Sequence, residues 1–140
     1  MTTREDFESY LMRLGVEYDE VDDGIWVIQG EQQHSTSIVV SYAPPLAVMR
    51  LKIMDLPPGG DDARCVNLFR RLLELNATDI VHGSYGIEGD EVVLSHALEL
   101  ADLDFGELRS SIESLTLATT SHTPMLVELV GAGQAVGQEG

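Results

Sequence analysis

The chain has 140 residues, of which 44% are hydrophobic, and this length predicts one domain that buries about two thirds of its unfolded surface. Its formal net charge of -16 comes from 24 acidic and 8 basic side chains, which argues against nucleic acid and anionic lipid as partners, because both are negatively charged. The longest apolar runs are too short for a membrane span, so the composition indicates a soluble globular protein. Its acidity either serves only to keep the protein soluble or suits a basic or amphipathic polypeptide partner.

A helix is predicted near the N-terminus. Apolar residues recur at helical spacing from Phe7 through Leu11 to Leu14, a capping-box pattern precedes them at residues 2–6, and Gly15 follows. The apolar stripe of this helix can serve either as core or as a docking surface for a partner.

Segments with strand character come next, separated by a turn at residues 22–24, a polar link at 30–33 and the break at Pro44-Pro45. They cover residues 16–21, 25–29, 35–42 and 46–54. The pattern predicts an antiparallel meander. Trp26 lies in the second segment. Because both of its neighbours are apolar, the pattern does not decide which face of the sheet it points to, and we expect it to be buried in the core.

The last of these segments has two distinct faces. One set of alternating side chains is apolar throughout and predicts the core face: Ala47, Met49, Leu51 and Ile53. The other set is mixed, so it is either an ordinary solvated face or a surface that holds an extended peptide through packing and charge. The candidate peptide-binding residues are therefore Phe7, Leu11, Trp26, Leu46, Val48, Arg50 and Lys52.

A second helix is predicted after the break at residues 57–60, capped by Asp61 or Asp62 and ending near Leu75. Its apolar band is wider than one contact with a sheet requires. We therefore take three of its residues as a candidate dimer interface: Val66, Phe69 and Leu73.

The C-terminal half begins with a hairpin that pairs residues 84–88 with 91–98 through a Gly-Asp turn. Asp104 caps a third helix that extends to about residue 117, and Thr123-Pro124 predicts a short fourth helix at 125–130. The composition from residue 131 onward predicts a disordered tail, so the expected organisation is one domain at 1–130 followed by a tail at 131–140.

No pattern of catalytic, cofactor-binding or metal-binding residues is present. The four histidines, among them His82 and His96, lack zinc-site spacing, and His96 is read as a neutral structural residue. Ser84 does not stand in a nucleophile elbow, and Asp104 is explained as a helix cap. With a single cysteine and no signal-peptide pattern, a cytoplasmic location is the simplest expectation.

The stretches at residues 72–76 and 82–94, with Leu103-Asp104 before the third helix, resemble the YbjN and type III secretion chaperone-like family over residues 3–120. The Pro44-Pro45 break and residues 55–58 look more like the YbjN-type members. The resemblance implies an α+β fold, a twisted antiparallel β-sheet with helices packed against it in the order α-β-β-β-α-β-β-α. It also implies a homodimer without enzymatic activity.

The resulting hypothesis is a non-catalytic module that binds a polypeptide partner as a homodimer, without a small-molecule substrate, cofactor or metal. A second hypothesis is a regulatory dimerisation scaffold that contacts a folded partner. A third is an enzyme with an unrecognised site, which a closed polar pocket holding His82 or His96 beside a buried carboxylate would indicate.

Overall fold

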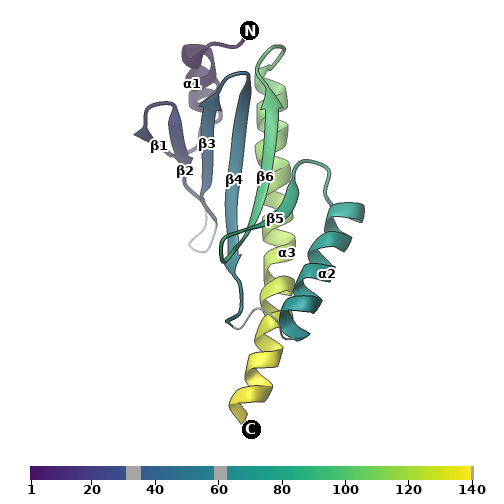
Figure 1. The fold of residues 1–140 in the computed structure, drawn as a ribbon. Coiled ribbons are helices and arrows are strands. Elements are labelled where there is room, and N and C mark those ends of the chain that lie inside the picture. Colours follow the sequence, from purple (N-terminus) through teal and green to yellow (C-terminus); the bar gives the residue numbers. More distant parts are fainter. Residues whose placement is uncertain (31–35, 59–62, 140) are drawn as a thin grey trace.

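The computed structural model describes residues 1–30, 36–58 and 63–139, with side chains up to residue 131 (Figure 1). Its elements in chain order are α1 (Arg4–Arg13), β1 (Tyr18–Asp22), β2 (Ile25–Ile28), β3 (Ile38–Ala43), β4 (Leu46–Asp55), α2 (Ala63–Thr78), β5 (Ser84–Glu88), β6 (Glu91–Glu99) and α3 (Phe105–Glu139). The predicted α+β class and antiparallel sheet are confirmed. Four strands precede α2, as the residue pattern predicts. The order implied by the family resemblance has three strands at this place. The start of the third predicted strand at Ser35, the candidate helix caps Asp61 and Asp62, and His34, one of the four histidines, lie outside the described residues.

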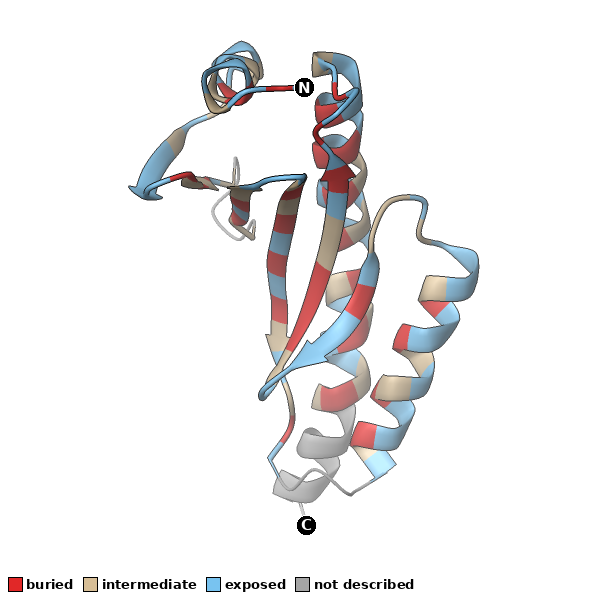
Figure 2. Cartoon of the chain, turned by 45° about the horizontal axis from the view of Figure 1, so that its top comes forward, coloured by how far each residue is buried: buried red, intermediate tan, exposed pale blue. Residues whose placement is uncertain are grey.

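The strands form one sheet in the order β1-β2-β3-β4-β6-β5, and all neighbouring strands are antiparallel. Residues directly opposite one another in antiparallel strands share a face. The register therefore aligns Trp26, Val40, Met49 and His96 on one side of the sheet. This is the side that the helices cover (Figure 2).

The core lies between this face and the helices. Phe7 of α1 stacks on Trp26 of β2, with ring centroids 5.6 Å apart, and both side chains are fully buried. Helix α3 runs behind β4 and β6, while α2 packs against α3 and β5 (Figure 1). The capping box at the start of α1 forms between Thr3 and Asp6.

The C-terminal region differs from the prediction. Residues 105–139 form one helix, α3, in place of two helices and a disordered tail. Pro124 lies inside it and is exposed, while Leu126 and Val130 beyond it are buried in the core. Proline removes one helical hydrogen bond, but burial of these apolar residues favours continuation, and extending a helix is easier than nucleating one.

Candidate polypeptide-binding surfaces

The face of the sheet opposite the helices is open. Because side chains alternate along a strand, the residues between the core positions point to this second face, and none of the described helices packs against it. Seven of its apolar members come from four strands: Ile25 and Val27 of β2, Val39 of β3, Leu46 and Val48 of β4, and Val93 and Ala97 of β6. Val93 is the buried member, with 7% of its surface exposed. We call these seven residues the open-face strip.

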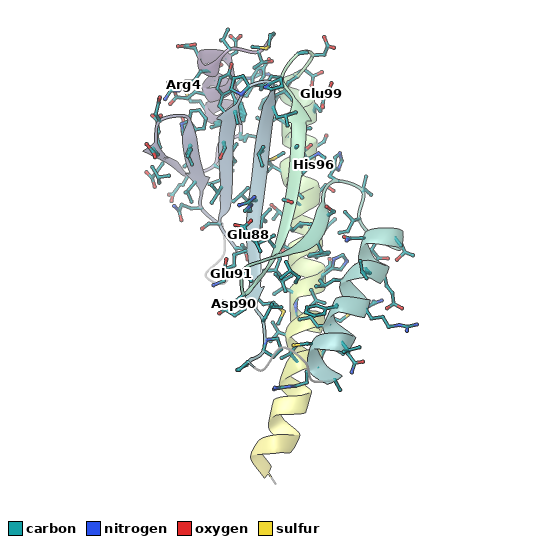
Figure 3. The ribbon with its side chains drawn as sticks, viewed as in Figure 1. Arg4, Glu88, Asp90, Glu91, His96 and Glu99 are labelled. Atoms are coloured by element: carbon teal, nitrogen blue, oxygen red, sulfur yellow. The ribbon has the colours of Figure 1, made fainter. Side chains whose placement is uncertain are left out.

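Charged side chains border the open-face strip. The Arg50 guanidinium lies 2.8 Å from a Glu88 carboxylate oxygen, and the Lys52 ammonium lies 3.0 Å from both Asp55 and Glu91. Hydrogen bonds to Asp55 and then Glu91 raise the pKa of Lys52. These pairs are about half exposed, so each contributes little to stability and can exchange for a partner's charges. Figure 3 shows Glu88 and Glu91 beside the lower ends of the strands.

A shallow hollow of about 310 Å³ lies beside the open-face strip where β5 begins. Its lining comes from three segments: Val48 and Arg50 of β4, Gly83 and Ser84 at the start of β5, and Ser95, His96 and Ala97 of β6. Two hydroxyls and one guanidinium alternate there with apolar surface. The hollow is open, and its lining includes His96 but no carboxylate.

The outer side of α2 forms a second apolar surface. Val66 and Leu73 expose 60% and 69% of their surface, and they line a hollow of about 520 Å³ together with Arg70, Glu74 and Ala77. Phe69 beside them is half-buried. The opposite side of the helix is buried against α3 and β5, so these exposed residues are not needed for the core of one chain.

The seven predicted peptide-binding residues separate into two groups. Leu46, Val48, Arg50 and Lys52 lie on the open face, as their alternation predicts. Phe7, Leu11 and Trp26 are fully buried and have no surface that a partner could contact. Their place in the core corrects this part of the prediction, because α1 folds onto β2 and uses its apolar stripe internally.

Several members of the open-face strip were not singled out from the sequence. Val27, Val39, Val93 and Ala97 join Val48 across neighbouring strands. The period-two alternation within β3 and β6 could have identified them as sharing a face, but their alignment across strands depends on the register of the sheet.

A buried polar group links β5, α3 and the end of α2. The Tyr85 hydroxyl lies 2.8 Å from Nδ1 of His122, whose Nε2 lies 3.5 Å from an Asp79 carboxylate oxygen. The hydroxyl donates to Nδ1 when Nε2 carries the ring proton. Burial, with Asp79 as a second cause, raises the pKa of Tyr85 to about 12, so this phenol stays protonated and is no nucleophile. The arrangement fixes three elements together.

His82 and His96 lie edge to face, with ring centroids 5.3 Å apart. Burial, with the neighbouring His82 as a second cause, lowers the pKa of His96, which fits its interpretation as a neutral structural residue. Within the described residues, no group of three or more potential ligands could hold a metal ion. No helix in that part of the chain is both long and apolar enough to cross a membrane.

Comparisons with solved structures identify the same fold at low identity. A chain of the heterodimeric ExoU-SpcU complex from the type III secretion system of Pseudomonas aeruginosa matches with a TM-score of 0.64 and 13% identity, covering 83% of this chain and 93% of that chain. YbjN from E. coli matches with a TM-score of 0.64 and 11% identity, covering 88% and 93%. A chain of the ExsC-ExsE complex matches with a TM-score of 0.66 and 14% identity, covering 90% and 97%.

A comparison with curated protein sequences gives no match. The family model CesT_Tir_1 matches residues 1–132, which is nearly the whole chain. The chain therefore belongs to the CesT_Tir_1 family of type III secretion chaperones.

Proposed function

We propose that this protein is a non-catalytic, cytoplasmic polypeptide-binding module that receives an extended, positively charged partner segment on its open sheet face. The observation that carries the proposal is the open-face strip, a set of apolar side chains on four strands that no described helix covers. Solved complexes of similar fold contain a polypeptide partner, as their names state for ExoU-SpcU and ExsC-ExsE. The net charge of -16 favours a basic segment.

The test is binding of a fluorescein-labelled heptapeptide that alternates valine and lysine, measured by fluorescence anisotropy. Val48→Asp places a carboxylate in the middle of the open-face strip, and we expect at least a tenfold loss of affinity. Leu117→Asp is the matched control, because it adds the same charge at a position of α3 that is 67% exposed. Equal affinity for the two variants would contradict the proposal.

We propose further that the protein is a homodimer that buries the outer side of α2. Val66, Phe69 and Leu73 form the apolar centre of this surface, and Arg70 and Glu74 form a polar rim around it. Sedimentation equilibrium should show a dimer for the wild type and a monomer for Leu73→Asp, because a carboxylate would be desolvated at the interface. A dimer that survives both Leu73→Asp and Val66→Asp would place the interface elsewhere.

A further inference from the structure

One row of side chains across the open face changes from apolar to polar. Ser84 of β5 lies opposite Ser95 of β6, and Ser95 lies opposite Arg50 of β4. The same row continues through Val39 of β3 to Val27 of β2. Because directly opposite residues of antiparallel strands share a face, all five side chains belong to the open face. The row is therefore polar over β5, β6 and β4 and apolar over β3 and β2.

Small residues leave the hollow beside the polar half of this row. Pairing of β5 with β6 begins at Ser84, whereas β6 continues to Glu99. Gly83 has a φ of +80°, and a Cβ there would lie 2.5 Å from the Ser95 carbonyl oxygen, so only glycine can pass this close to β6. The lining on this side is glycine, serine and alanine, whose side chains are too small to fill the hollow of about 310 Å³.

The polar groups of the hollow have unused hydrogen-bonding capacity. Neither the Ser84 nor the Ser95 hydroxyl bonds to a residue that the structure describes. One terminal nitrogen of Arg50 contacts both carboxylate oxygens of Glu88, at 2.8 and 3.1 Å. The other guanidinium nitrogens have no partner in the described part of the chain. The hollow therefore offers two hydroxyls and part of a guanidinium as hydrogen-bond donors.

These donors fit a singly charged carboxylate. Hydroxyl and guanidinium groups donate to oxyanions, and no carboxylate lines the hollow. Arg50 is the only basic residue of the lining, and Glu88 beside it already balances part of its charge. A phosphate group carries about two negative charges and would lack a second cation there. The net charge of -16 disfavours such a dianion further.

We propose that the hollow binds the C-terminal carboxylate of the partner polypeptide, whose preceding residues lie across the strands on Val39 and Val27. This inference rests on the proposed function and specifies which end of the partner binds and in which direction it runs. Neighbouring strands are about 4.8 Å apart, so β4 and β2 are separated by about 10 Å, or roughly three residues of an extended chain. The last apolar side chain of the partner contacts Val48 and Ala97, which also line the hollow.

The position of the hollow favours a chain end over a free small carboxylate. The hollow is open, so a small molecule in it stays largely in contact with water. A chain end gains further burial from the residues that precede it, because the apolar half of the row adjoins the hollow. Strand β5 is the last strand of the sheet, so the apolar surface does not continue past the hollow.

Two versions of the valine–lysine heptapeptide test the chain end. Both carry fluorescein at the N-terminus and end in valine, one with a free carboxylate and the other with an amide. We expect the free acid to bind about tenfold more tightly, because its carboxylate accepts charge-assisted hydrogen bonds. The overall field predicts the opposite order, since the amide peptide carries one more positive charge toward an acidic protein. Equal binding, or tighter binding of the amide, would overturn the proposal.

Two arginine variants locate the carboxylate. Arg50→Gln removes the guanidinium from the hollow, so the preference for the free acid should disappear. Arg109→Gln is the matched control, because it removes the same charge from a side chain of α3 that is also about half exposed and paired with one glutamate. Its preference for the free acid should equal that of the wild type. A preference that survives in Arg50→Gln would place the carboxylate elsewhere and overturn the assignment.

N-acetylvaline distinguishes a chain end from a free carboxylate, since it has the terminal group of the acid peptide without the preceding residues. At equal concentration it should not displace the labelled acid peptide, and displacement would overturn the chain-end proposal. Loss of the acid preference in the wild type, with Val48→Asp still weakening the binding of both peptides, would overturn the hollow and leave the proposed function standing. A wild-type protein that binds neither peptide would overturn both.

Discussion

Asn76→Ala should destabilise the protein although this side chain is neither apolar nor fully buried. Asn76 forms two hydrogen bonds with the backbone of Tyr85, at 2.7 and 3.1 Å, and thereby joins α2 to the outer edge of β5. Each such bond contributes about 0.5–1.5 kcal/mol net, so their loss lowers the free energy of unfolding by about 1–3 kcal/mol. The gain in helix propensity from asparagine to alanine offsets roughly 0.5 kcal/mol of this loss.

Asn67→Ala is the matched control. Asn67 lies in the same helix, is exposed and has no hydrogen bond with any described residue, so its replacement gives the same change in helix propensity without removing a hydrogen bond to that part of the chain. The difference in unfolding free energy between the two variants therefore isolates the hydrogen bonds to Tyr85. It is measured by urea unfolding at one protein concentration, followed by circular dichroism.

A difference near zero between Asn76→Ala and Asn67→Ala would refute this reasoning. Amide exchange gives an independent result, because the N–H of Tyr85 loses its acceptor in Asn76→Ala and should exchange faster. Asn76→Asp should be intermediate, since it keeps an acceptor for this N–H and loses the donor to the carbonyl.

Three further outcomes are expected from urea unfolding. Phe7→Ala should lower the free energy of unfolding by about 3–5 kcal/mol, because the ring is fully buried against Trp26. An unchanged free energy of unfolding would instead support the original prediction that Phe7 contacts a partner. Tyr85→Phe should lower it by about 1–3 kcal/mol, since Nδ1 of His122 loses its buried partner; a smaller loss in the double variant with His122→Ala than the sum of the single losses would confirm the coupling. Burial lowers the pKa of His96 in the folded state, so the unfolded state binds protons more readily just below pH 6.5. The contribution of neutral His96 to stability is therefore complete above that pH and is lost as the pH falls. The urea unfolding midpoints at pH 7.5 and 5.5 should differ less in His96→Gln than in the wild type, and equal differences in the two proteins would argue against this role of His96.

The local patterns of the sequence were sufficient to place most elements. The hairpin was predicted because Gly89 supplies the positive φ of its turn, and β5 spans Ser84–Glu88 as expected. The two faces of β4 were predicted because strand side chains alternate with period two. Thr3 and Asp104 act as helix caps in the structure, since capping depends only on neighbouring residues.

The roles of several residues depended on contacts between distant parts of the chain. An apolar stripe such as that of Phe7 and Leu11 does not reveal whether its own sheet or a partner covers it, and only the packing of α1 on Trp26 decided this. The continuation of α3 past Pro124 likewise followed from burial of Leu126.

The sequence by itself determined which side chains of each strand share a face, because that depends on chain geometry alone. Only the tertiary structure decided which face remains open and where β6 lacks a neighbour. Strand register, the turn at Gly83 and the contact of Asn76 with Tyr85 are set by contacts that form only when separate segments come together.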